Sequence, residues 1–102
     1  MPYTLKLFDS DDMPAPQRRA AEQRFRRALE GSLGDPALVL PMRAAYQRIV
    51  AVYGEIPDAD SLSEAQRAVF EQWQAAESAA VSAAFGTHRY MGDAMYEIGA
   101  AP

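Results

Sequence analysis

Apolar side chains recur with the period of an α-helix in three segments of the chain, and this pattern predicts three amphipathic helices. The first is expected over residues 16–30, where Gly31 and Gly34 supply the stop signal. The second is expected over 36–53, and the third, which is the longest, over 62–85. Each of these segments ends next to a glycine, as helices in globular proteins often do.

Local signals refine the limits of the second and third helices. Asp35 and Pro36 are typical of a helix start, and Pro41 predicts a kink or restart because proline lacks an N–H and clashes with the preceding turn. Ser61 or Ser63 can cap the third helix. Ser61 also stands three residues before a glutamate, which is the spacing of a capping box.

The apolar positions assign one buried face to each helix. In the first helix this face is expected to hold Ala21, Phe25, Ala28, Leu29 and Ser32. In the second it holds Met42, Ala45, Tyr46, Ile49, Val50 and Tyr53, with Arg43, Gln47 and Arg48 facing away. In the third, a seam of heptad-like spacing runs through Leu62, Gln66, Val69, Trp73, Ala76, Ala80 and Ala83.

Trp73 is the largest apolar group of that seam, and we expect it to anchor the core. The alternative is a contact with a partner, because tryptophan is enriched at the energetic centres of protein interfaces.

The secondary structure of the two ends of the chain follows less clearly from the pattern. Residues 1–13 contain an alternating stretch, YTLKLF, that predicts a short strand before an entry segment. Residues 87–99 fit a short helix or a strand; we favour the helix, although a lone N-terminal strand needs a partner and this tail is the candidate. The predicted fold is mainly α: one domain over residues 1–102, forming a small three- to four-helix bundle. A minimal β-ribbon of the two termini is the α+β variant.

Length and composition limit the classes of function. A chain of 102 residues corresponds to a single domain. It has no cysteine, no secretory signal and no run of apolar residues long enough to span a membrane, so we expect a cytoplasmic protein that does not bind membranes. The net charge of −4 argues against general affinity for nucleic acid, which depends on phosphate neutralisation.

Five arginines are concentrated in the stretch RRAAEQRFRR of the first helix. They cover most of the circumference that is not core, which is typical of a solvated helix. As candidate partner-binding residues we nevertheless single out Arg18, Arg19, Arg26 and Arg27, together with Trp73. An acid-rich segment, 55–77, offers the arginines a counterpart within the chain or across a dimer.

Groups with catalytic or metal-binding chemistry are sparse. The single histidine, His88, makes a zinc site improbable, and a set of Ser78, His88 and Asp93 has no accompanying nucleophile motif. The acidic cluster Asp9–Asp12 follows a strand, but the spacing of a calcium-binding loop fails there. We therefore expect no catalytic residues, no metal and no cofactor.

The leading hypothesis is a small non-enzymatic protein–protein interaction module: a regulator, adaptor, inhibitor or immunity-type protein. Its partner is another protein or a second copy of the chain, and a homodimer through the third helix or the tail is expected because Ala76–Ala84 offers a close-packing face. The alternative is a nucleic-acid-associated regulator that uses the arginines of the first helix. A small enzyme, with His88 and Asp9–Asp12 as its best candidates, comes third.

Overall fold

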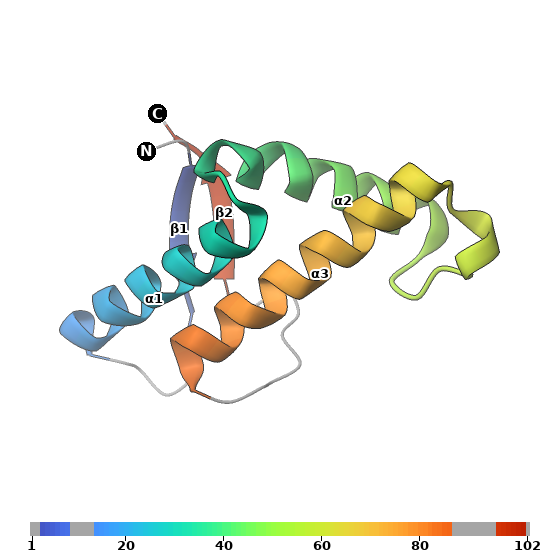
Figure 1. Cartoon of the computed structure of the whole chain (residues 1–102). Coiled ribbons are helices and arrows are strands. Elements are labelled where there is room, and N and C mark those ends of the chain that lie inside the picture. Colours follow the sequence, from blue (N-terminus) through green and yellow to red (C-terminus); the bar gives the residue numbers. More distant parts are fainter. Residues whose placement is uncertain (1–2, 9–13, 87–95, 102) are drawn as a thin grey trace.

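In the described part of the chain, the fold consists of three helices and a two-stranded antiparallel ribbon (Figure 1), and the expectation of a mainly α domain with a small β-ribbon is confirmed. The computed structural model describes residues 3–8, 14–86 and 96–101. Its elements are β1 (Tyr3–Leu7), α1 (Ala15–Leu33), the 3₁₀ turn η1 (Pro36–Leu38), α2 (Val39–Tyr53), the 3₁₀ turn η2 (Ala59–Ser61), α3 (Glu64–Phe85) and β2 (Tyr96–Ala100).

Helix α1 is longer than the sequence predicted, because only one of its two glycines ends it. Gly31 lies inside the helix, whereas Gly34 adopts the left-handed conformation with φ of 86° and donates its N–H to the carbonyl of Glu30. Glycine reaches this conformation without a steric penalty, which makes it the usual helix terminator. The extra turn buries Leu33 in place of the expected Ser32, which is exposed.

Helix α2 runs unbroken through Pro41, so the helix does not restart there as one form of the prediction had it. Asp35 caps η1 by accepting the N–H of Ala37 at 2.9 Å, and α2 itself begins at Val39. Pro41 therefore falls in the first turn of α2, where the N–H groups have no partner inside the helix and a missing one costs little.

Helix α3 begins with a capping box, but not the one expected from Ser61. Ser63 accepts the N–H of Gln66 on its hydroxyl, and the side chain of Gln66 accepts the N–H of Ser63. The buried face is also shifted slightly toward the carboxyl end: Ala84 is buried where Ala83 was expected, and Phe70 joins the core.

The C-terminal residues form a strand, which corrects the preference for a helix over the part of 87–99 that the structure describes. Residues 96–100 pair with β1 in antiparallel register, from Tyr3 opposite Ala100 to Leu7 opposite Tyr96. The pairing satisfies the backbone groups that face the partner strand and directs Tyr96 and Ile98 inward, which a helix does not do for positions two apart. Residues 87–95 lie outside the described part of the chain.

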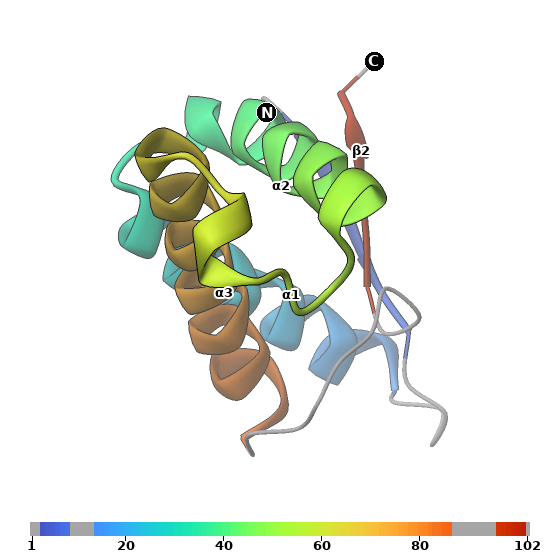
Figure 2. The same ribbon diagram turned by 90° about the vertical axis from the view of Figure 1, so that its right-hand side faces the viewer.

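Two hydrophobic clusters hold the elements together. The main cluster joins the inward face of the ribbon to α1, the start of α2 and the C-terminal two-thirds of α3. Figures 1 and 2 show α1 and α3 running side by side in opposite directions, with the ribbon and α3 on opposite sides of the molecule. The smaller cluster lies between α2 and α3 and is built on Ile49, Leu62 and Phe70.

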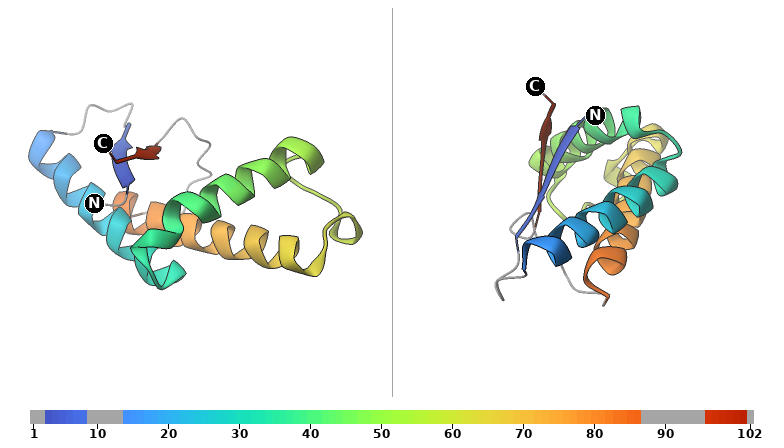
Figure 3. Two further views of the ribbon diagram at one scale, coloured as in Figure 1. Left: turned by 90° about the horizontal axis from the view of Figure 1, so that it is seen from above. Right: turned by 90° about the vertical axis from the view of Figure 1, so that its left-hand side faces the viewer.

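The smaller cluster belongs to a projecting part of the molecule. Residues 45–70, which comprise most of α2, the connecting loop and the start of α3, extend beyond the ribbon and α1 (Figure 3, left). The molecule is correspondingly elongated, with extents of 44 × 26 × 21 Å. We call residues 45–70 the arm.

Candidate functional site

The side chain of Arg24 joins α1 to α3. Its Nε–H donates to the carbonyl of Ala83 at 2.8 Å and its Nη2 donates to the carbonyl of Ala84 at 2.9 Å. These carbonyls belong to the last turn of α3, where helix carbonyls have no partner inside the helix and the helix dipole favours a positive charge. The guanidinium thus acts as a C-terminal cap supplied by a neighbouring helix.

Two further arginines lie over the rings of the ribbon tyrosines. The Arg26 guanidinium is 4.8 Å from the ring centroid of Tyr3, and that of Arg43 is 5.9 Å from the ring centroid of Tyr96. Both distances suit cation–π attraction. Arg26 is half-buried rather than largely exposed, and Arg43 faces the ribbon rather than solvent, so the sequence-based placement of these two side chains is wrong.

The remaining arginines of α1 do not form one cationic face. Arg18 is half-buried, while Arg19 and Arg27 are exposed. Phe25 and Leu29 are fully buried on the opposite side of the helix, as expected. Of the four arginines singled out as partner-binding, two therefore remain fully available on the surface.

The alanine face of α3 packs against α1 of the same chain. Ala76, Ala80 and Ala84 are buried, and Ala21 of α1 is buried in the same cluster. Small side chains let two helix backbones approach closely, and α1 takes this position. The expected homodimer through Ala76–Ala84 therefore lacks its surface, and self-association stays a prediction without this face to support it.

Trp73 is a core residue, which confirms the expectation of an anchor. Its side chain is 1% exposed, and its ring lies 6.4 Å from that of Tyr46 on α2. Tyr46 also stacks on Phe70 at 5.2 Å, so these rings connect the main cluster to the smaller one inside the arm. A partner reaches Trp73 only if the domain opens.

Each strand of the ribbon is tied to a helix by a tyrosine–glutamate hydrogen bond. The hydroxyl of Tyr3 donates to Glu30 of α1 at 2.5 Å, and that of Tyr96 donates to Glu77 of α3. Burial, followed by the hydrogen bond to Glu30, raises the pKa of Tyr3 far above its usual range. These bonds satisfy the polar atoms of two large side chains whose rings are buried in the core.

The most exposed apolar side chains of the described residues lie at the tip of the arm. Ile56, in the loop after α2, is 95% exposed, and Val52 in the last turn of α2 is 73% exposed. Tyr53 beside them is partly exposed. Gly54, with φ of 85°, turns the chain between them. Full burial of such a side chain contributes roughly 1.5 to 3 kcal/mol, and the fold does not bury these side chains.

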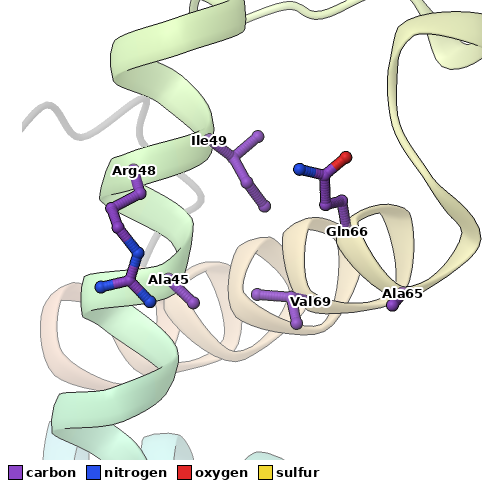
Figure 4. Close-up of a pocket in the computed structure, with 6 residues that line it drawn as sticks. All are labelled: Ala45, Arg48, Ile49, Ala65, Gln66 and Val69. Carbon is purple, nitrogen blue, oxygen red and sulfur yellow. The ribbon is translucent and has the colours of Figure 1, made fainter.

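An open pocket lies on the same arm, between α2 and α3 (Figure 4). Its volume is 290 Å³, and its lining is apolar apart from Arg48 and Gln66; the remaining lining residues are Ala45, Ile49, Ala65 and Val69. Val52 follows Ile49 and Arg48 by about one helical turn, on the same face of α2. The pocket and Val52 therefore lie along one side of α2.

Exposed acidic side chains occur in the loop of the tip and at the start of α3. Glu55, Asp58, Asp60 and Glu64 are all exposed, and Glu64 lies in the first turn of α3. Within the described ranges, none of these four carboxylates forms an ion pair with another side chain. The cationic groups nearest to them in sequence are Arg48 and Arg67. The tip thus combines exposed apolar side chains with four exposed carboxylates, which we call its rim.

Catalytic and metal-binding arrangements are not evident in the part of the chain that the structure describes. No group of three or more metal-ligating side chains occurs among those residues. His88, Asp93 and Asp9–Asp12, the candidates for enzyme chemistry, lie outside the described residues, so the structure does not test them. Among the helices of the described residues, none combines the length and the apolar character that crossing a membrane requires.

The sequence analysis did not identify the arm tip, although a signal was present. At about 100° per residue, Val52 falls beside Arg48 at the edge of the polar face of α2, outside the predicted apolar stripe. Ile56 stands alone in a polar loop between a glutamate and a proline. An apolar side chain at such a position is expected to stay exposed to solvent. Two of them within five residues indicate an interaction surface.

Comparison with known proteins finds no matching family model, no similar curated protein and no similar solved structure.

Proposed function

We propose that this protein is a protein–protein interaction module that docks through the arm. The observation that carries the proposal is the exposure of Val52 and Ile56, at 73% and 95%, on an arm that also has an apolar pocket. Exposed apolar side chains scattered singly need no explanation, but two of them within five residues, on an arm with a concave apolar surface, favour an interface. A regulator, adaptor, inhibitor or immunity-type role is consistent with this mode of action.

The architecture of the arm favours docking over a purely structural role. Its own small cluster, built on Ile49, Leu62 and Phe70, supports it from inside. The exposed residues therefore sit on a scaffold that does not require them for its own packing. A side chain presented in this way loses little conformational freedom on binding, and such preorganisation favours affinity.

The alternative, a nucleic-acid-associated regulator, depends on the arginines of α1 reaching phosphates together. Arg24 is hydrogen-bonded to α3 and Arg26 lies over Tyr3, so both are already engaged within the chain. Arg19 and Arg27 remain on the surface. Two arginines on an acidic protein give little counterion release, and we therefore place the nucleic-acid function second. The proposed setting is the cytoplasm, with which the absence of cysteine agrees.

Site-specific photo-crosslinking in the native host tests the proposal. A photoreactive amino acid is placed at position 52 or 56, and at the exposed control positions 19 and 74, one at a time. We expect one discrete protein adduct from positions 52 and 56 and none from the controls. The adduct formed from position 52 should weaken when Ile56→Ser is combined with it, because the same surface is then less apolar.

Two results contradict the proposal. Adducts that form equally from all four positions indicate random collisions rather than an interface. Absence of an adduct from both arm positions, when the protein is produced and folded at its normal level, indicates that the arm has no partner.

A further inference from the structure

We infer that the arm's partner is a different protein whose contact surface has an apolar centre and a rim of lysine or arginine side chains. This inference rests on the proposed function and adds the chemistry of the partner. Its basis is the charge pattern of the tip, where Glu55, Asp58, Asp60 and Glu64 are exposed on the loop that carries Ile56 and at the start of α3. The exposed apolar residues give affinity, and the carboxylates select a cationic rim.

The charge asymmetry of the described chain supports this assignment. Residues 54–71 contain five acidic side chains and one arginine, whereas α1 contains five arginines and two glutamates. Complementary potentials speed up association and reject partners of like charge. An acidic rim on an exposed apolar tip therefore favours a basic surface and disfavours an acidic one.

A second copy of this chain is a poor occupant of the tip. In a two-fold symmetric dimer the same patch meets itself, so the carboxylates of one tip would face those of the other. A head-to-tail contact between the tip and α1 of another copy brings opposite charges together. That contact does not close on itself in a two-fold dimer, and it would build rings or open chains instead.

A lipid surface is disfavoured by the same charges. Anionic headgroups attract basic segments, and each exposed carboxylate at the tip opposes an approach to them. The tip is also small, with Val52, Tyr53 and Ile56 as its exposed apolar residues, which is less apolar surface than stable insertion requires.

A selection experiment tests the inference and does not require the partner to be identified first. The probe is a display library built on a stable helical scaffold whose surface positions are randomised, so that folded faces of every charge are offered. The library is selected on the full chain and, in parallel, on the Val52→Ser/Ile56→Ser variant. We expect binders that depend on Val52 and Ile56 and that are enriched in apolar residues flanked by lysine or arginine.

A variant in which three of the four carboxylates of the tip are neutralised then measures what these charges contribute to affinity. Glu55→Gln, Asp58→Asn and Asp60→Asn are combined, and Glu64 is left in place because a negative charge favours the start of α3. The selected binders should lose about tenfold or more in affinity at low salt, and added salt should reduce this difference. The control, Glu22→Gln/Glu97→Gln, removes negative charge away from the arm and should leave binding nearly unchanged.

The outcomes separate this inference from the proposed function. Binders that require Val52 and Ile56 but carry no excess of basic residues overturn the cationic partner and leave the docking arm intact. Failure to obtain any binder that requires these two residues overturns the docking arm itself. Light scattering of the chain alone, and sedimentation with vesicles that contain anionic lipid, provide the remaining checks. The inference is also overturned if the chain associates with itself or with these vesicles and the Val52→Ser/Ile56→Ser variant does not.

Discussion

The guanidinium of Arg24 closes the carboxyl end of α3, where it donates a 2.9 Å hydrogen bond to the carbonyl of Ala84. A second bond, at 2.8 Å, reaches the neighbouring carbonyl. One arginine of the arginine-rich helix thus joins α1 to α3. The contact between Arg24 and Ala84 shows that an arginine of this cluster has a structural role, so a cluster of arginines on an acidic protein need not be a binding surface.

Replacing Arg24 is expected to destabilise the domain. Arg24→Gln removes two charge-assisted bonds and a favourable charge at a helix end, and we expect a loss of about 1 to 2 kcal/mol, limited by the exposure of the side chain. Urea denaturation followed by circular dichroism measures it. The control is Arg19→Gln, an exposed residue of the same helix, which should change stability by less than about 0.5 kcal/mol. Equal effects of the two substitutions would contradict the capping role.

Trp73→Ala should cost roughly 3 to 5 kcal/mol, as for other large buried aromatic residues. The reason is its burial and its position between the two clusters, where its ring faces Tyr46. The exposed neighbour Gln72 provides a control, since Gln72→Ala should have little effect. Urea melts of the variants and the unmodified chain decide the matter, and a loss below about 1 kcal/mol for Trp73→Ala would mean that the side chain is not part of the core.

Two positions one turn apart on α2 test the surface of the arm. Ile49→Ala should cost about 2 to 5 kcal/mol because Ile49 is buried in the smaller cluster. Val52→Ala should change stability by less than about 0.5 kcal/mol because Val52 is exposed. Thermal melts of both variants measure the contrast. A large loss for Val52→Ala would place this residue in the packing of the domain and remove it from the docking surface.

Stability should fall at alkaline pH because of Tyr3. Burial raises the pKa of this hydroxyl, so above the usual tyrosine pKa of about 10 the folded chain keeps a proton that the unfolded chain releases. The free energy of unfolding therefore decreases as pH rises through that range. Tyr3→Phe is less stable than the unmodified chain at neutral pH, since Glu30 loses its donor, and the difference should shrink above about pH 10.

Denaturant melts at about pH 8 and about pH 10.5 provide the comparison for Tyr3, since they lie on either side of the usual tyrosine pKa. A stability difference between Tyr3→Phe and the unmodified chain that stays constant across this interval would show that Tyr3 ionises equally in both states.

Binding to nucleic acid should be weak. We expect no affinity for generic duplex DNA tighter than about 10⁻⁴ M at physiological salt, because few arginines of α1 are available together and the chain is acidic overall. Fluorescence anisotropy with labelled duplex and single-stranded DNA at two salt concentrations tests this. Micromolar affinity with a steep salt dependence, abolished by combining Arg19→Gln, Arg26→Gln and Arg27→Gln, would restore the nucleic-acid hypothesis.

The elements that the sequence predicted well are those governed by local rules. Gly34 and Gly86 end helices because glycine adopts the left-handed conformation at little cost, and Asp35 caps the turn before α2. The buried faces of the helices followed from the helical period, so that Phe25 and Trp73 were placed correctly in the core.

What the sequence could not decide depends on contacts between distant segments. The tail 87–99 fits a helix or a strand by spacing, and only pairing with β1 selects the strand over its described part. Arg43 was expected to face away from the core because it lies outside the apolar stripe of its helix, yet its guanidinium lies over the ring of Tyr96. The position of Val52 outside that stripe was visible, but the helical period does not show whether another segment covers this side of α2.

The ribbon also constrains the order in which the domain is assembled. Tyr3 is paired with Ala100, so β1 has no strand partner until residues 96–100 have been synthesised. During translation α1, α2 and most of α3 can collapse while the edge of β1 that faces β2 stays unpaired. Closing so long a loop is slow relative to helix formation, and it should be the last step of folding. The folding chain thus passes through a stage in which β1 exposes an unpaired strand edge to chaperones and to neighbouring chains.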